Sequence, residues 1–271
     1  MVFLDGKWLS EKEAKARIYE PGFLYGQGVF ETMLARGGNI FRLEAHLSRL
    51  CKSAGLVGIN LEYPWGELKD MVTRAVKMER RHFSYVRLTV WAASPGSAAH
   101  ISLVSRDYRP YSRERYLQGF AAVLSRMRQN EFSFLSNIKS SCRLHLFLAE
   151  LEAKDKRADE AILRNTRGNI AEGTRTNIFL VKDNMLRTPD ISSGCLPGVM
   201  RETVMEIAAR EKMAADEGAI SLEELFGADE AFLTNSLIGV MPCTVIDGRG
   251  IGQGRPGRIT QILMEKLEGY A

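Results

Sequence analysis

The chain has few cysteines, and they are not paired in the sequence. Cys51, Cys142, Cys195 and Cys243 are widely separated, without a C-x-x-C pair or a neighbouring histidine. Metal sites are usually built from clustered thiols and imidazoles, and disulfide scaffolds from regularly spaced cysteines. The sequence therefore indicates neither a metal site nor a disulfide framework, and it favours a reducing compartment.

Long hydrophobic runs are also missing. No apolar run approaches the roughly 20 residues that a helix needs to cross a bilayer. The first residues, 1–7, lack a basic segment followed by an apolar stretch, so no signal peptide is predicted. We expect a cytoplasmic protein that does not insert into a membrane.

The charge balance gives little support to nucleic-acid binding. The sequence has 37 basic and 33 acidic residues and a formal net charge of +4. Its one local concentration, 77–82, falls in an expected helix and is typical of a solvated face. We expect small-molecule substrates, and the mild basic excess suits an anionic substrate or cofactor.

With 271 residues, of which 45% are hydrophobic and 26% charged, the chain is large enough for two domains. The polar stretch 106–113 contains Pro110 and lacks periodicity, so it predicts a connection. We expect an N-terminal α/β domain over 1–107, a connection over 108–118 and a C-terminal domain over 119–271. Strands and helices mix without regular βαβ alternation, which favours an α+β fold.

Hydrophobic periodicity predicts the individual elements. An Asp-Gly pair between short apolar runs predicts a hairpin over 2–8. The expected strands are 29–35, 85–91, 99–105, 119–125, 160–164, 177–182 and 230–233, and the expected helices are 43–54, 65–80, 143–157 and 199–212.

Two residues of opposite charge suggest cofactor chemistry. Most lysines are surface charges, but Lys139 lies in the uncharged stretch 134–142 after largely apolar residues. Burial or a nearby cation lowers the pKa of an amine, which then serves as a nucleophile and a general base. Glu172 stands before a glycine turn and an apolar strand, at the expected mouth of that strand. An imine-forming amine and a carboxylate facing a ring nitrogen are what pyridoxal phosphate needs, although neither residue is convincing alone.

Three further places could bind a phosphate. Proline and glycine precede the helix expected from Val199, whose first amides and those of Met200 could face an anion; a simple capped helix is the alternative. Ser236 lies in 234–242, which could equally be an ordinary loop. Arg49 shares a helix face with His46, and its guanidinium could clamp a phosphate, whereas His46 is expected to be structural.

Six segments, taken in order, resemble the class IV aminotransferases, the pyridoxal-phosphate enzymes of fold type IV. This family includes branched-chain and D-amino acid aminotransferases and 4-amino-4-deoxychorismate lyases. The segments that carry the resemblance are Tyr25–Thr32, Phe41–Leu50, Lys139, Glu172–Phe179, Leu196–Arg201 and Thr234–Pro242.

The resemblance implies a role for each matching residue. Lys139 would form the internal aldimine and shuttle the proton, and Glu172 would pair with the pyridine nitrogen. The residues implied to hold the phosphate end of the cofactor are Arg49, Val199, Met200, Ser236 and Leu237. The family has a small N-terminal α/β domain and a larger C-terminal domain with the cofactor in the cleft. Its members are usually homodimers in which a neighbouring loop completes the site, and we expect a homodimer here.

The sequence departs from the family at several positions. Leu144 replaces a tyrosine that several members carry near the cofactor's phenolic oxygen, so Arg143 or Arg175 is expected to tune the cofactor instead. Trp91–Ala93 replaces an Arg-Gly pair of D-amino acid aminotransferases and many lyases, and Arg87 is a candidate substitute. Branched-chain enzymes tend to have an acid where Gly239 stands. The residues expected to contact substrate are Tyr25, Phe30, Arg87, Trp91, Arg143 and Arg175.

Three functions compete. We predict amino-group transfer between an amino acid and a 2-oxo acid. The alternative is 4-amino-4-deoxychorismate lyase activity, which releases 4-aminobenzoate and pyruvate; residues 235–243 resemble that branch more, whereas Trp91–Ala93 departs from it. A non-catalytic binding protein is the third reading, and the presence of both Lys139 and Glu172 argues against it.

Overall fold

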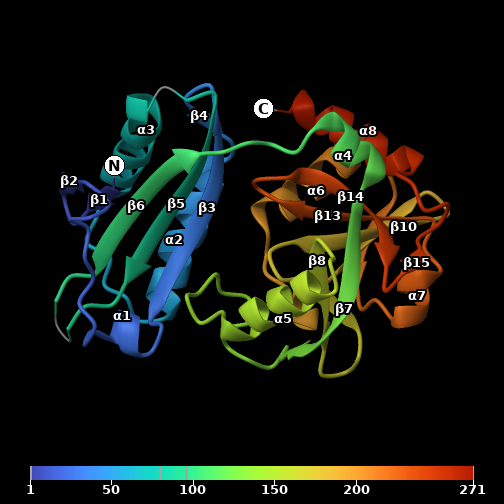
Figure 1. The fold of residues 1–271 in the computed structure, drawn as a ribbon, viewed down its shortest axis with the longest axis horizontal. Coiled ribbons are helices and arrows are strands. Elements are labelled where there is room, and N and C mark those ends of the chain that lie inside the picture. Colours follow the sequence, from blue (N-terminus) through green and yellow to red (C-terminus); the bar gives the residue numbers. More distant parts are fainter. Residues whose placement is uncertain (1, 80, 95–96, 271) are drawn as a thin grey trace. The chain divides into compact units, whose positions relative to one another are not determined.

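The computed structural model describes residues 2–79, 81–94 and 97–270 (Figure 1). The chain forms two compact units. The first contains Met1–Pro110 and Ile138–Arg143, and the second contains Tyr111–Asn137 and Leu144–Ala271. The short stretch with Lys139 therefore packs with the first unit. The expected domain limits, 1–107 and 119–271, stay predictions.

The first unit is built on a six-stranded sheet in the order β2-β1-β6-β5-β3-β4, with neighbouring strands antiparallel. The turn after β1 has positive φ at Asp5 and Gly6, which suits a two-residue hairpin and confirms the predicted hairpin. The strands are β1 Val2–Leu4, β2 Lys7–Leu9, β3 Gly28–Arg36, β4 Asn39–Ile40, β5 Phe83–Trp91 and β6 His100–Asp107.

Two helices cover one face of this sheet. They are α2 (Leu43–Leu56) and α3 (Trp65–Glu79); a short α1 (Pro21–Leu24) precedes β3. The predicted stripe of α2 is buried at Leu47, Leu50 and Ala54. Alternate residues of β5 are buried, as a strand with one core face requires. Arg87 lies on the other, less buried face. The predicted helix 65–80 is confirmed as far as residue 79, and Arg80 lies outside the described residues.

The second unit is built on a nine-stranded sheet in the order β12-β11-β10-β13-β14-β7-β8-β9, and β15 pairs with β14. Three strand pairs are parallel, namely β11/β12, β14/β7 and β7/β8. The strands are β7 Phe120–Gln129, β8 Glu160–Asn165, β9 Ile170–Gly173, β10 Asn177–Lys182, β11 Met185–Pro189, β12 Ala215–Gly218, β13 Glu230–Asn235, β14 Gly239–Ile246 and β15 Arg249–Gly250.

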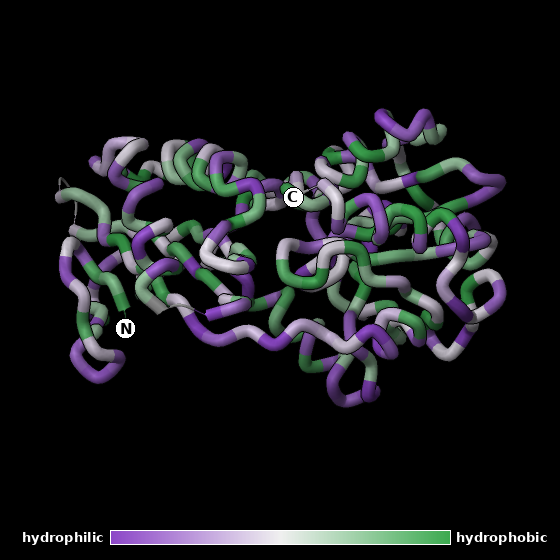
Figure 2. The backbone as a smooth tube through the Cα atoms, turned by 90° about the horizontal axis from the view of Figure 1, so that it is seen from above, coloured by the Kyte–Doolittle hydropathy of each residue, from purple (hydrophilic) through white to green (hydrophobic). Residues whose placement is uncertain are grey.

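The helices of the second unit pack against this sheet. The elements are α4 Arg113–Gln118, α5 Leu144–Asp155, α6 Val199–Arg210, α7 Leu222–Phe226, α8 Arg258–Glu268 and the 3₁₀ turn Ile191–Ser193. Helix α5 lies on β7 and β8, while α6 and α8 pack on β13 and β14. Beneath α6 the rings of Phe179 and Phe232 stack 4.9 Å apart. Hydrophobic stretches lie mainly in the strands and helices of each unit, and many connecting loops are hydrophilic (Figure 2).

The structure adds detail to several local expectations. The stretch 108–118, expected as the connection, contains α4. Glu172 lies within the short strand β9, which pairs with β8, and it precedes the turn that leads into β10, as expected. Strand β14 already begins at Gly239, so only the middle of 234–242 is a loop. Helices α7 and α8 and strands β11 and β12 were not predicted.

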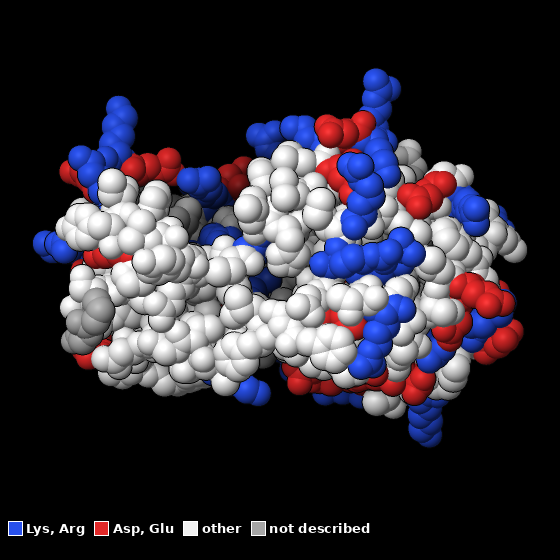
Figure 3. Space-filling view, turned by 90° about the horizontal axis from the view of Figure 1, so that it is seen from below, with Lys and Arg blue, Asp and Glu red and all other residues white. Residues whose placement is uncertain are grey.

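The surface is mixed in charge. Basic and acidic side chains occur close together on the face drawn in Figure 3. Among the described residues, the structure has no helix that is both long and apolar enough to cross a membrane.

Candidate active site

Lys139 is held by strand β3 of the first unit. The carbonyl oxygen of Lys139 accepts a hydrogen bond from the Phe30 amide at 3.0 Å, and Ser140 forms a β-bridge with Val29. The backbone on both sides of the lysine is therefore fixed to a regular strand. A half-buried amine on a fixed backbone keeps its direction better than a lysine on an open loop.

Three cationic side chains gather around the Phe30 ring. Lys139 Nζ lies 5.0 Å from the ring centroid, the guanidinium carbon of Arg87 3.8 Å and that of Arg143 5.4 Å. All three distances are within the range of a cation–π contact. Because like charges repel, such a group favours an anionic ligand. The structure thus brings together four residues that were expected at the site from separate parts of the sequence.

Arg49 is held by a buried carboxylate. Its Nε and Nη2 donate to the two oxygens of Glu31, each at 2.7 Å, and His46 Nδ1 lies 2.7 Å from the same carboxylate. Burial alone raises the pKa of Glu31, but the charge of Arg49 and the hydrogen bonds of His46 and Arg49 outweigh it and bring that pKa to about 2. Burial lowers the pKa of His46, although Glu31 opposes the change. His46 is therefore structural, as expected.

Glu172 lies in the second unit and is almost fully buried. One of its oxygens accepts a hydrogen bond from the Leu196 amide at 2.9 Å. This bond joins the carboxylate to the turn that precedes α6. Asn177, from β10, donates to the carbonyl of the same Leu196 at 2.8 Å. Glu172 and the turn before α6 therefore form one connected arrangement.

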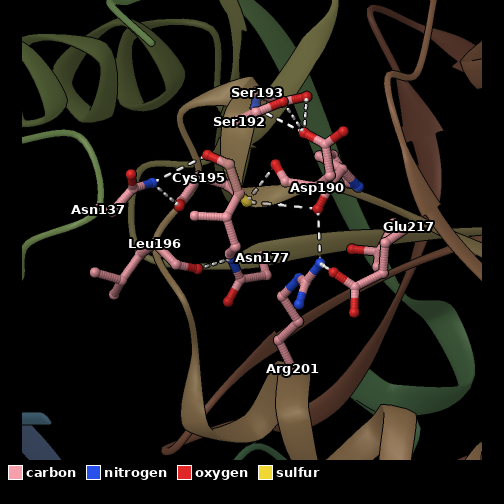
Figure 4. Close-up of polar contacts among 12 residues, drawn as sticks. Asn137, Asn177, Asp190, Ser192, Ser193, Cys195, Leu196, Arg201 and Glu217 are labelled. Carbon is pink, nitrogen blue, oxygen red and sulfur yellow. Dashed lines mark hydrogen bonds and ion pairs between the residues drawn. The ribbon is translucent and has the colours of Figure 1, made fainter. Parts of the chain in front are cut away.

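The turn over 189–197 is fixed by several polar contacts (Figure 4). The side-chain amide nitrogen of Asn137, Nδ2, donates to the backbone carbonyls of Ile191 and Cys195, at 3.1 and 2.8 Å. On the other side, Arg201 donates to the Pro189 carbonyl at 2.8 Å and pairs with Glu217. Since backbone carbonyls are satisfied from both sides, the turn has a defined shape.

Helix α6 begins in a geometry suited to an anion. Gly198 precedes the helix and, as glycine, has no side chain to cap its first amides. A Cβ at this position would lie 2.0 Å from Asn177 Oδ1, so only glycine fits. Val199 and Met200 supply the first helical amides and are buried. These observations support the phosphate-binding reading over a helix end closed by its own side chain.

The loop between β13 and β14 is arranged around Asn235. Its Oδ1 accepts hydrogen bonds from the Leu237 and Ile238 amides, at 2.8 and 3.0 Å. The Leu237 amide is thus already used within the loop. Thr234 lies opposite Asn177 in the sheet. Among the described residues, the buried hydroxyl of Thr234 has no hydrogen-bond partner, which leaves one donor open beside the turn before α6.

The other expected substrate residues lie in different surroundings. Arg175 forms an exposed ion pair with Glu150 of α5 at 3.3 Å. Trp91 stacks on His100 with ring centroids 5.3 Å apart. Tyr25 is largely exposed and ends α1. These contacts do not involve the cations around Phe30, so the expected substrate roles of the three residues stay predictions.

Glu160 is a residue that sequence reasoning missed. Its buried carboxylate accepts hydrogen bonds from the hydroxyls of Thr174 and Thr176, at 2.5 and 3.0 Å, and from the Thr174 amide at 3.0 Å. It thereby holds the turn that follows Glu172. An acid directly before the apolar residues 161–163 of the strand was the available signal, since an acid buried there needs polar partners.

The described part of the chain contains no group of three or more histidine, cysteine, aspartate or glutamate residues arranged to hold a metal. The first unit instead offers a lysine amine, and the second offers a buried carboxylate next to a fixed turn and a helix start without a side-chain cap. These are the groups that an aldehyde, a ring nitrogen and a phosphate require, and they fit pyridoxal phosphate.

Known proteins are similar to this chain over most of its length. Residues 28–246 match the model of the amino-transferase class IV family. The branched-chain-amino-acid aminotransferase of Pseudomonas aeruginosa is 31% identical over 279 residues, covering 98% of this chain and 91% of its own length. The D-alanine aminotransferase of Staphylococcus epidermidis is 31% identical over 281 residues, covering 99% and 97%.

A solved structure agrees with this relationship. The branched-chain aminotransferase of the archaeon Thermoproteus uzoniensis, solved with norvaline, has a TM-score of 0.91 at 31% identity and covers 98% of this chain and 93% of its own. The chain belongs to the class IV aminotransferase family, with the fold type IV architecture expected from the sequence. It is a pyridoxal-phosphate-dependent aminotransferase, which confirms the predicted enzyme class and cofactor.

Proposed function

We propose that the enzyme transfers the amino group of a branched-chain L-amino acid to a 2-oxo acid. The observation that carries this proposal is the group formed by Phe30, Arg87, Lys139 and Arg143, in which an apolar ring and two guanidinium groups accompany the amine. A guanidinium suits the carboxylate common to all amino acids, and the buried Phe30 ring holds the cations in one place. The Pseudomonas aeruginosa relative is named for branched-chain substrates.

In this proposal the first unit supplies the reactive amine. Lys139 Nζ would hold the cofactor covalently, and as a general base it would take up the proton that the substrate Cα releases. Arg87 binds the substrate carboxylate, and Phe30 and Tyr25 bound the side-chain pocket. Arg49, oriented by Glu31, would bind phosphate through its guanidinium. Arg143 adds positive charge beside Lys139.

The second unit supplies the carboxylate and the anion-binding amides. Bound pyridoxal phosphate provides an electron-withdrawing ring that accepts the electron pair left when Cα loses its proton. Glu172 keeps a proton at the ring nitrogen, and its bond to Leu196 fixes its direction. The amides of Val199 and Met200 bind the phosphate together with Ser236, while Leu237 contributes by packing because its amide is used by Asn235.

The proposed substrate class is tested with a panel of amino donors. We expect L-valine, L-leucine and L-isoleucine to react with 2-oxoglutarate at least about tenfold faster, by kcat/KM, than D-alanine reacts with the same acceptor. The reason is that Trp91–Ala93 lacks the arginine expected in D-amino acid enzymes, and a missing guanidinium at a carboxylate site costs about 1.4 kcal/mol or more.

A faster reaction with D-alanine would instead support the specificity in the name of the Staphylococcus epidermidis relative. The same panel includes 4-amino-4-deoxychorismate, because the lyase was the alternative expected from the sequence. The relatives named above are aminotransferases, so the lyase is not favoured. Release of 4-aminobenzoate without amino-group transfer would reject the proposal.

We also propose that the protein is a homodimer. Helix α5 buries Ala149 and Ala153 against the rest of the second unit, whereas its exposed side carries large apolar residues. Four large side chains at helical spacing, each 39–70% exposed, form this α5 stripe. An exposed apolar stripe of this kind favours a protein partner, and a second copy is the occupant that the family resemblance implies. The residues of the α5 stripe are Leu144, Phe147, Leu148 and Leu151.

Charge placed in the α5 stripe should weaken the dimer. We expect the wild type to have twice the chain mass of 30.4 kDa in analytical ultracentrifugation, and Phe147→Glu to raise the dimer dissociation constant at least about tenfold. Ala209→Glu introduces the same side chain at an exposed position of α6, outside the α5 stripe, and should leave the mass unchanged. If Phe147→Glu does not change the dimer dissociation constant, the dimer interface does not include the α5 stripe. The cytoplasmic location stays a prediction.

A further inference from the structure

His100 stands between two carboxylates in the first unit. Its Nδ1 lies 2.6 Å from Asp5 Oδ2, and its Nε2 lies 3.0 Å from Glu20 Oε1. A neutral imidazole carries one N–H, whereas the imidazolium carries two. Because an ionised carboxylate only accepts hydrogen bonds, His100 can bond to two ionised carboxylates at once only when it is protonated. The geometry therefore favours the cation.

Glu20 depends on this histidine. The Glu20 residue is 2% exposed, and its second oxygen, Oε2, is buried without a hydrogen-bond partner among the described residues. Arg17 approaches the first oxygen only to 4.0 Å, and its side chain is mostly exposed. Asp5 is better supplied, since its Oδ1 also accepts the Ile101 amide at 2.9 Å. A buried carboxylate that loses its main donor is strongly destabilised.

The same histidine supports α1. Its ring stacks on Trp91, with an angle of 29° between the ring planes. Gly22 of α1 packs directly on this tryptophan, because a Cβ at Gly22 would lie 2.3 Å from Trp91 Cδ1. The Gly22 amide also donates to the Ala92 carbonyl at 3.1 Å. Glu20, immediately before α1, and Gly22, within it, are thus fastened to the same end of the sheet.

The fastened segment leads to the lysine. Tyr25 ends α1, and its carbonyl accepts a hydrogen bond from the thiol of Cys142 at 3.3 Å. Cys142 is three residues beyond Lys139. Movement of α1 would therefore displace Tyr25, whereas Lys139 stays bonded to β3 through its own backbone.

We infer that His100 is a positioning residue for substrate binding, which in its protonated form fastens Glu20 and so holds α1 and Tyr25 in place. The inference rests on the proposed role of Tyr25 at the substrate pocket. When His100 loses its proton, Glu20 loses a hydrogen-bond donor, and α1 is released from the sheet. Substrate binding then weakens, while the chemical step at Lys139 is little affected.

The charges around His100 set the pH range. Burial alone lowers the pKa of His100, but the hydrogen bonds and charges of Asp5 and Glu20 outweigh it and raise that pKa above its ordinary value. Arg17 lies 4.0 Å from the Glu20 carboxylate. Tyr63 interacts with Asp5, and burial together with the Asp5 charge raises the pKa of Tyr63. Because the pKa of His100 is raised, its hydrogen bond to Glu20 is fully formed below the ordinary pKa of about 6.5 and is lost as the pH rises through the raised pKa.

The test combines a spectroscopic titration with kinetics of the holoenzyme. A protonated imidazole stacked on an indole quenches the indole fluorescence. The fluorescence of Trp91 is obtained by subtracting the signal of Trp91→Phe from that of wild type, and its intensity should increase as the pH rises. His100→Gln should remove this transition. The KM of His100→Gln for an amino donor should exceed the wild-type KM about tenfold below the transition and equal it above, with kcat changed less than about twofold. His82→Gln, the same change at an exposed histidine, should match the wild type throughout.

Two results would overturn the inference. One is a fluorescence transition that persists in His100→Gln, because another group would then be titrating. The other is a KM ratio that does not change with pH, which a merely structural histidine would give. If Trp91→Phe does not fold, the imidazole NMR signal lost in His100→Gln reports the same titration. A wild type inactive towards every amino donor would reject the proposed function instead.

Discussion

Lys139→Ala should lose aminotransferase activity by a factor on the order of 10³ or more in kcat/KM. The amine is the group proposed to hold the cofactor and to move the proton, and removal of a nucleophile that also acts as general base eliminates both steps. The alanine side chain leaves the two backbone contacts to β3 intact, because they use the Lys139 carbonyl and the Ser140 bridge. Steady-state assays with the preferred donor measure the loss.

The control for this prediction is Lys182→Ala. Lys182 is an exposed lysine that pairs with Asp229 at 3.1 Å, so its removal should leave kcat/KM within about twofold of wild type. Circular dichroism establishes that both variants are folded. The absorbance band of the covalently held cofactor should disappear in Lys139→Ala and remain in Lys182→Ala. Normal turnover by Lys139→Ala would remove the lysine from its proposed role.

Glu31→Gln should lower the free energy of unfolding by about 3 kcal/mol at neutral pH. The pKa of Glu31 falls from an ordinary 4.5 to about 2, and each pKa unit corresponds to about 1.4 kcal/mol. The glutamine leaves Arg49 without its charge partner in a largely buried place, which is costly by itself. Denaturant unfolding at constant pH measures the change.

The pH dependence gives a second reading of the same interaction. A depressed pKa contributes stability that is present above about 4.5 and is lost as the pH falls towards about 2. Wild type should therefore lose its advantage over Glu31→Gln in acid, and the two unfolding curves should converge. Glu44→Gln is the matched control, since Glu44 lies in an exposed pair with Lys69, on the helix that carries Arg49, and should change stability little. A constant difference at all pH values would contradict the assignment.

Elements with a strong local pattern were predictable. The alternation of β5 and the apolar stripe of α2 are properties of neighbouring residues, and both elements form where expected. Helix α7 was missed although its signal was present: Ser221 and Glu224 form a capping box. Strand β9 was missed because four residues ending in Glu172-Gly173 carry too little pattern to identify a strand.

Other features could not be read from local sequence because their partners lie far along the chain. The start of α8 is capped by Glu230, which accepts the Ile259 and Thr260 amides at 2.9 and 2.8 Å from 29 and 30 residues away. The same holds in the candidate site. Sequence patterns singled out Arg49 and Glu172 as single residues, whereas the groups that orient them, Glu31 and the Leu196 amide, became evident only in three dimensions.

The unequal burial of the four thiols has a practical consequence. Burial raises the pKa of Cys51 and Cys243, and it raises that of Cys195 to about 12, so all three resist alkylation at neutral pH. Cys142 is the exposed thiol, and it contacts the carbonyl of Tyr25. Cys142 is thus the preferred attachment point for a fluorescent or spin label, three residues from Lys139. A label there would follow movement of α1 in real time without engineered cysteines.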